Sequence, residues 1–216
     1  MSKEMRALKH LSPSTLAPPV WAGKRLLQFV QQLNERCLEL LSRMAHADSD
    51  GSTHTFIHLH QGLWRRLQAA DRRRAARLPF ILVDIHFMDP EWWQNAFEIS
   101  EETSPASETD SLSVKISEQL VTETLMFVWH AVQSDPRSAV VSVGMSKEVS
   151  SILARLGAHD IRRVASRCRG EVRPRWWNAP EWWRRLLEAA LKESDTALHE
   201  THLAAKLMLC GELLSQ

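Results

Sequence analysis

The sequence predicts an all-α protein, mainly a helical bundle, and three observations support this fold class. Apolar residues recur at alternating spacings of three and four over several stretches, which is the period of an amphipathic helix. Cap residues and early prolines, which start helices, precede several stretches in the second half of the chain. With 44% hydrophobic residues among 216, the chain has enough apolar side chains to bury a core.

The first predicted helix covers residues 24–45. It follows residues 1–20, whose prolines, serines and threonines are typical of a flexible arm. Its apolar residues form a seam three heptads long: Leu26, Val30, Leu33, Cys37, Leu40 and Met44.

A second helix is predicted over 56–76, after a polar loop at 46–55 and before Pro79, which stops it. One side of this helix carries leucines at 59, 63 and 67. Its second half holds a basic cluster: Arg65, Arg66, Arg72, Arg73, Arg74 and Arg77.

The stretch 80–87, Phe-Ile-Leu-Val-Asp-Ile-His-Phe, is the one good strand candidate. A lone strand makes no sheet, so an extended buried segment and part of another helix are alternative interpretations. Residues 98–114 are acidic and rich in serine, which indicates a linker. The predicted organisation is therefore an arm at 1–20, a helical domain at 21–97, the linker at 98–114 and a second helical domain at 115–216.

The second domain is expected to be helical throughout. A long helix is predicted over 116–134, and Asp135-Pro136 should cap and start a short helix that Gly144 closes. Ser146 should cap a helix that runs to Leu156, and Gly157 should separate it from a helix at 159–168. Two further helices are predicted, one opened by a capping box at 178–181 and one capped near Asp195 with a stripe of Leu198, His202, Ala205 and Leu209.

Charge is segregated along the chain although the net charge is only +1. Residues 89–124 hold nine carboxylates and one lysine, whereas residues 155–185 hold nine arginines and three carboxylates. The three cysteines, Cys37, Cys168 and Cys210, are far apart and form neither a disulfide framework nor a zinc motif. We therefore expect reduced thiols and, because no secretory signal is visible, a cytoplasmic protein. We also expect no membrane span, because no apolar run approaches ~18 residues.

The tryptophans suggest a partner-binding surface. The chain has nine tryptophans and no tyrosine, and six of the tryptophans are adjacent pairs. Neighbours on a helix point ~100° apart, so a pair shares its indole surface between two elements or with a partner. The candidate partner-binding residues are Trp176, Trp177, Trp182 and Trp183, and plain core packing is the alternative.

A candidate helix-turn-helix lies between Glu148 and Arg169, where a turn at 155–157 joins two helices. The second helix would pack its apolar side inward and leave a basic side outward. Arginine pairs with phosphates and with guanine, so this side is a candidate DNA-binding surface. Its candidate residues are Arg162, Arg163, Ser166, Arg167 and Arg169; a solvated basic helix is the alternative.

The same stretch resembles the FlhD family of bacterial flagellar master regulators. The resemblance rests on Ser138 to Val149 (SAVVSVGMSKEV), continuing through Ile152 to Leu156 (ILARL) to Val164-Ala165. It covers about residues 113–190. It implies an all-helical, dimer-forming regulator that acts with a second, zinc-binding subunit on promoter DNA. This chain lacks a four-cysteine zinc set, so it would not be the zinc-binding subunit.

Signs of chemistry are few. His54, His58 and His60, with Asp84, His86 and Asp89 further on, are the residue types that bind zinc or iron, but their spacing fixes no site. The chain lacks a glycine-rich phosphate loop and the common hydrolase motifs. We therefore expect no enzyme activity, metal, cofactor or small-molecule substrate.

Two functions remain as hypotheses. The first is a bacterial transcription regulator subunit that acts through DNA, a partner regulator or both. The second is a non-enzymatic cytoplasmic adaptor of a type III secretion or conjugation apparatus. Both predict a homo- or hetero-oligomer.

Overall fold

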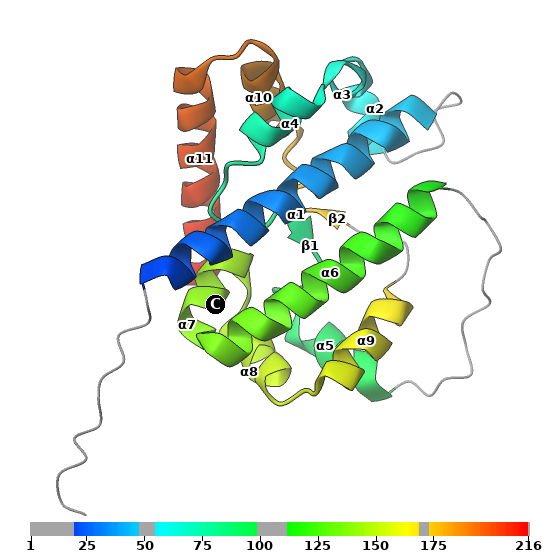
Figure 1. Cartoon of the computed structure of the whole chain (residues 1–216), viewed down its shortest axis with the longest axis vertical. Helices are drawn as coiled ribbons and strands as arrows, with labels where there is room; N and C mark the ends of the chain where they lie inside the picture. The colour runs from blue at the N-terminus through cyan, green and yellow to red at the C-terminus, as the bar shows by residue number, and fades with distance from the viewer. Residues whose placement is uncertain (1–19, 48–54, 99–111, 169–172, 216) are drawn as a thin grey trace, which may run out of the picture.

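The computed structural model describes residues 20–47, 55–98, 112–168 and 173–215, and within them the chain is mostly helical (Figure 1). The predicted all-α fold class is confirmed. The expected arm, most of the loop at 46–55 and most of the acidic linker at 98–114 lie outside the described residues. Among the described helices, none has the length and apolar character needed to cross a bilayer.

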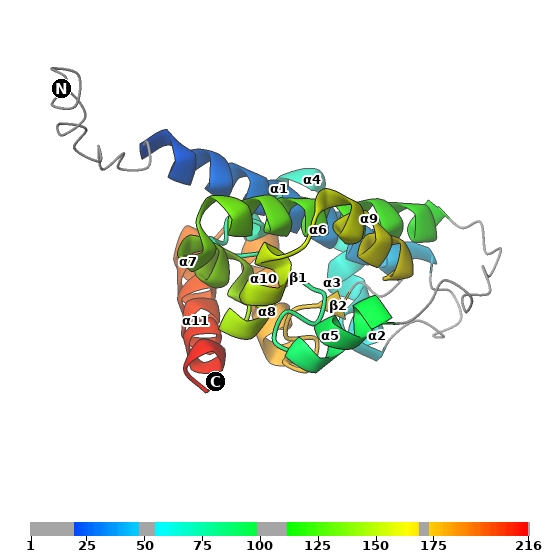
Figure 2. The ribbon, with the colours of Figure 1, turned by 90° about the horizontal axis from the view of Figure 1, so that it is seen from below.

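Two long helices, α1 (Val20–Ala47) and α6 (Leu112–Ser134), lie side by side and form one layer of the molecule (Figures 1 and 2). The predicted seam of α1 faces the core, which confirms the heptad pattern. Its middle four residues are buried and its ends are partly buried: Val30, Leu33, Cys37 and Leu40, then Leu26 and Met44. An ion pair between Arg36 and Glu123 joins the two helices at their exposed edge.

The single helix predicted over 56–76 is wrong. The structure has three short helices there: α2 (Thr55–Leu59), α3 (Gln61–Arg66) and α4 (Ala69–Ala75). The second break has a local cause, because the backbone of Gln68 is extended and its N–H donates to the carboxylate of Asp71 at 2.8 Å, which caps α4. The predicted leucine side is therefore interrupted: Leu67 is buried, whereas Leu59 is 58% exposed.

The stretch 80–87 is a buried extended segment that contains one two-residue strand, β1 (Val83–Asp84). It pairs antiparallel with β2 (Arg173–Pro174), so the predicted strand exists but is short. The side chain of Asn34 on α1 satisfies the backbone beside it. Its amide donates to the carbonyl of Phe80 at 2.9 Å and its oxygen accepts the N–H of Leu82 at 2.7 Å.

Four short helical elements are α5 (Pro90–Glu98), α7 (Pro136–Ala139), the π-helical turn η2 (Val140–Gly144) and α8 (Lys147–Ala154). The segment at 80–87 is hydrogen-bonded to two residues of this group, Ser142 and Ser146. The predicted start and end signals are confirmed here. Asp135 accepts hydrogen bonds from the first turn of α7, and Ser146 accepts the N–H of Val149 at 3.0 Å. Gly144 ends the π-helical turn with a φ of 67°.

The chain ends with three helices, α9 (Ala158–Arg167), α10 (Pro180–Leu191) and α11 (Asp195–Leu214). The capping box predicted at 178–181 is wrong: the N-cap is Ala179, which has no side-chain acceptor, although Pro180 does begin the helix. Ser194, one residue before the predicted cap, starts α11 by accepting the N–H of Ala197 at 3.2 Å.

The described parts of both predicted domains contribute to one hydrophobic core. Buried residues from 30–93 and from 120–209 belong to a single cluster. The two halves also share the β1–β2 pair, and α10 packs against α3 and α4 (Figure 1). The division at 98–114 therefore does not separate two independent cores.

Candidate functional site

The helix pair α8 and α9 has the predicted order of a helix, a turn and a second helix. Gly157 is the N-cap of α9, and its N–H donates to the carboxylate of Asp160 at 3.0 Å. Ile161, Val164 and Ala165 are buried, as the sequence predicted, and α9 packs along α6. The opposite side of α9 is thus its outward face.

The candidate arginines of α9 differ in availability. Arg162 and Ser166 are exposed, whereas Arg163 forms an ion pair with Asp160 at 3.3 Å. Arg167 is turned inward, where its guanidinium donates to the carbonyl of Ala96 in the last turn of α5. A helix end leaves carbonyls unpaired, so Arg167 has a structural role there. Arg169 lies outside the described residues.

The tryptophan pairs are mainly core residues. Trp176, Trp182 and Trp183 are at most 7% exposed, and the indole N–H of each has an acceptor in the chain. Both neighbours on α10 can be buried because this helix lies between α11 on one side and α3 and α4 on the other. The prediction that these three tryptophans bind a partner is corrected: their surfaces are already covered.

Trp177 is the exception, with 54% of its surface exposed. It follows Trp176, whose φ of 54° is in the left-handed region that bulky residues rarely adopt. The unusual backbone allows Trp176 to bury its ring against Phe80, at 5.6 Å between centroids, while the next indole faces solvent. Strained backbone of this kind occurs often at binding sites.

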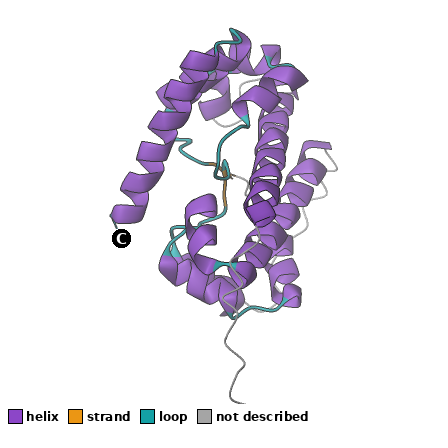
Figure 3. Cartoon of the chain, turned by 60° about the vertical axis from the view of Figure 1, so that its left-hand side comes forward, coloured by secondary structure: helices purple, strands orange, loops and turns teal. Residues whose placement is uncertain are grey.

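The outward face of α11 is the apolar surface that the sequence analysis missed. It is formed by Leu203, Leu207 and Leu214, which are 50%, 67% and 84% exposed, and by the exposed Cys210. The spacing of 4, 3 and 4 between these residues is a second heptad seam, opposite the buried stripe of the same helix. This signal was readable in the sequence, because α11 is apolar on both sides. Figure 3 shows α11 at the edge of the molecule.

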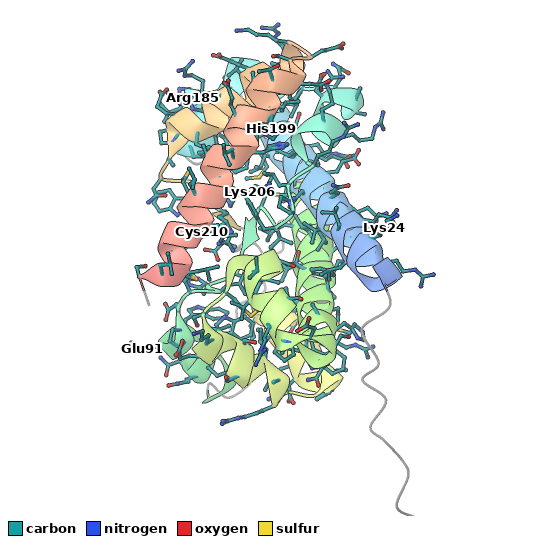
Figure 4. All side chains as sticks on the ribbon, turned by 90° about the vertical axis from the view of Figure 1, so that its left-hand side faces the viewer. Lys24, Glu91, Arg185, His199, Lys206 and Cys210 are labelled. Atoms are coloured by element: carbon teal, nitrogen blue, oxygen red, sulfur yellow. The ribbon has the colours of Figure 1, made fainter. Side chains whose placement is uncertain are left out.

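Charged residues border this apolar face. His199 and Lys206 are one heptad apart on the side that Figure 4 shows, together with Cys210, and all three are exposed. Helical spacing places Glu200 on the opposite border. The face is therefore an apolar strip with charges of both signs along its borders, including Lys206 on one border and Glu200 on the other.

Of the candidate metal-binding residues, His86 and Asp89 lie 3.9 Å apart, but the described candidates do not form a group of three. His54 lies outside the described residues, His58 is exposed, and His60 is hydrogen-bonded to the carbonyl of Pro180 at 3.0 Å. His86 stacks on Trp92 with ring centroids 4.6 Å apart. Within the described segments no three histidine, cysteine or carboxylate side chains are grouped as metal ligands would be.

Arg175 is a buried charge with a structural role. Its guanidinium, 3% exposed, donates to the carbonyls of Ile81 at 3.2 Å, Val143 at 2.6 Å and Gly144 at 3.1 Å. It also pairs with Glu212 of α11 at 3.2 Å. The acceptors of all these hydrogen bonds belong to the chain itself. Arg175 therefore joins the segment at 80–87, the π-helical turn and α11.

No family model, curated protein or solved structure matches this chain.

Proposed function

We propose that this chain is a non-catalytic adaptor or regulatory subunit that acts by binding a partner protein. The observation that carries the proposal is the outward face of α11, with three leucines at least half exposed in a heptad pattern. A soluble monomer rarely exposes a continuous apolar strip, and such strips commonly mark binding sites. The occupant proposed for this face is a partner with an apolar groove that receives α11.

A groove fits this face better than a second copy of α11 does. Stable interfaces use about 20–30 residues on each side. The outward face of one 20-residue helix offers fewer than that, so two copies of α11 alone would make a small contact. A groove that surrounds the helix would contact its leucines and both borders.

Site-specific photo-crosslinking in the native host tests this proposal. A photoreactive side chain at position 207 should crosslink one protein of defined mass, and the same group at the exposed Ser151 of α8 should not. The captured protein must then bind the parent chain when both are purified. Equal crosslinking at the two positions, or a purified chain that forms a dimer through Leu207, would overturn the proposal.

A second candidate function is favoured by the outward side of α9. Arg162 and Ser166 are exposed there and Arg163 is partly exposed, which suits a regulator subunit that contacts DNA phosphates. Replacing Arg162 and Arg163 by alanine should lower the affinity for promoter DNA and reduce the salt dependence by roughly one per lost phosphate contact. Arg167 is left unchanged because it holds α5. An unchanged salt dependence in the complex with the partner subunit would remove α9 from DNA binding.

A further inference from the structure

The most concentrated positive charge of the described chain lies on α3 and α4, far in sequence from α9. Residues 61–79 contain six arginines and one carboxylate, Asp71. That carboxylate is 8% exposed and fully used, since it accepts hydrogen bonds from the guanidinium of Arg74 and from the N–H of Gln68. The segment therefore has no second carboxylate that could pair with its outward arginines.

The six arginines divide into two groups. Three hold the fold by donating to backbone carbonyls: Arg65 to Ala45 at 2.8 Å, Arg72 to Leu67 at 2.9 Å, and Arg74 to Ala190 at 2.9 Å. The other three, Arg66, Arg73 and Arg77, are exposed; Arg73 has a long ion-pair contact of 4.0 Å with Glu35 and its side chain remains 61% exposed. These three are available for a ligand, and we call them the arginine ridge.

The ridge lies on a fixed support. Both α3 and α4 pack against two longer helices, α1 and α10, which hold them in place (Figure 1). Arg185 of α10 is also exposed (Figure 4), and its charge acts on the carboxylate of Glu181 in the same helix. A rigid positive surface loses little conformational freedom when it binds an anion.

We propose that the arginine ridge binds the phosphate backbone of a nucleic acid. Arginine presents a planar donor fork that matches a phosphate oxygen pair, and several such contacts give affinity without base recognition. The exposed residues between the arginines are Gln68, Ala69 and Ala70, which are small or polar and allow close approach. A surface that inserts into a lipid membrane has large apolar side chains among its basic residues, and the exposed residues of 61–77 include none.

Titration of labelled duplex DNA of mixed sequence with the full-length chain, at several salt concentrations, tests this inference. Replacing Arg66, Arg73 and Arg77 by alanine should weaken binding and lower the slope of log K against log salt by about two to three. Lysine at the same positions should retain most of the slope, because the charges remain. The control replaces Lys24, Arg137 and Lys147, three exposed cations on α1, α7 and α8, by alanine and removes the same net charge.

The outcomes separate this inference from the other proposals. A lower affinity for duplex DNA in the ridge variant, with little change in the control, supports the inference. A lower affinity in the Arg162 and Arg163 variant alone assigns DNA binding to α9 instead. Equal loss in ridge and control variants, no binding by the parent at low salt, or binding to phosphatidylserine vesicles without binding to duplex DNA would each overturn it. If the triple variant fails to fold by circular dichroism, the single change Arg66→Glu replaces it. Binding of the α11 partner should be unaffected by the ridge variant.

Discussion

Arg175, which follows β2, links the segment at 80–87, the π-helical turn and α11 through one buried guanidinium. Methionine at this position would fill similar space but leave three buried carbonyls without donors. Arg175→Met should therefore lower the free energy of unfolding by about 3 kcal/mol or more. Urea unfolding followed by tryptophan fluorescence measures it. Arg173→Met, at an exposed neighbouring position, is the control and should change the stability little; equal effects of the two changes would contradict the structural role.

The three cysteines should differ in reactivity. Burial raises the pKa of the Cys37 thiol to about 12, and Cys168 is also buried, whereas Cys210 lies on the exposed face of α11. The thiolate is the reactive form, so a buried thiol with a raised pKa reacts slowly. A thiol reagent such as Ellman's reagent should label one cysteine quickly in the native chain and the others only after unfolding. Cys210→Ser should abolish the fast phase; a fast phase that persists in this variant would contradict the burial of Cys37 and Cys168.

His202 should make the stability depend on pH. Burial lowers the pKa of its imidazole, with smaller contributions from the charges of Lys206 and His199 on α11 and Arg77 beyond α4, while a hydrogen bond to the backbone of Ala75 raises it in part. The unfolded chain then binds a proton more readily than the folded chain does. The stabilising effect of the neutral imidazole is complete above the unfolded pKa of about 6.5 and is lost as the pH falls below it.

Unfolding at a series of pH values checks this dependence. The stability of the parent should fall more steeply than that of His202→Gln between neutral and mildly acidic pH, because glutamine does not titrate. His58→Gln, a change at an exposed position, should follow the parent. Identical pH profiles for the parent and His202→Gln would show that His202 does not contribute.

At the residue scale, the sequence predicted the caps at Asp135 and Ser146 correctly but not those of α4 and α10, and it predicted tryptophan exposure poorly. Asp135 and Ser146 act through hydrogen bonds to nearby N–H groups, so their role is local and readable. The exposure of Trp177 and the burial of Trp176 depend on a left-handed backbone and on packing against Phe80, which is distant in sequence. Such contacts are set by the tertiary fold. The inward turn of Arg167 toward Ala96 has the same origin.

At the scale of the element, α1 is the clearest success of pattern analysis, because a seam of three heptads leaves one face to bury. The region 56–76 shows the opposite case. Its leucines have helical spacing, but Gln68 and Asp71 form a cap inside the segment, and that signal was overlooked among the arginines. The outward seam of α11 was also missed, because this helix is apolar on two opposite sides and the stripe with Leu198 and Leu209 alone accounts for a helix packed on a core.

The seam of α1 gives a direct test at this scale. Leu33 is 5% exposed, so Leu33→Asp places an unpaired carboxylate in the core and should cost several kcal/mol of unfolding free energy, roughly 3 or more. Gln32→Asp, at the adjacent exposed position of the same helix, should change the stability by roughly 0.5 kcal/mol or less. Chemical denaturation distinguishes the two variants. Equal stability of Leu33→Asp and the parent would mean that the seam is not buried.

At the scale of the whole molecule, the fold class followed from composition and periodicity, whereas the way the two halves combine did not. Charge and serine content at 98–114 predicted separate domains, yet the buried residues of both halves form one cluster. The contacts that join them, including β1 with β2 and α10 with α4, involve residues about 90 to 120 positions apart. No local pattern reports pairings at that distance.

A single core predicts cooperative unfolding. Two signals should show the same midpoint in urea. One is circular dichroism, which reports helix content, and the other is tryptophan fluorescence, which reports the packing around Trp64, Trp93 and Trp183. Leu33→Asp in the first half and Arg175→Met in the second should shift both signals together. Two separate transitions, each sensitive to only one of the variants, would show that the halves fold independently.

The central claim is that the chain acts through the outward face of α11. The most direct test is the affinity between the purified chain and the purified partner that crosslinks at position 207. Leu207→Asp puts a charge in the middle of the apolar strip, where the side chain is 67% exposed in the free chain, so the fold should be retained. The affinity for the partner should fall by a hundredfold or more, about 3 kcal/mol. Ser151→Asp on α8 should leave the affinity unchanged. An affinity that is the same for the parent and Leu207→Asp would contradict the claim.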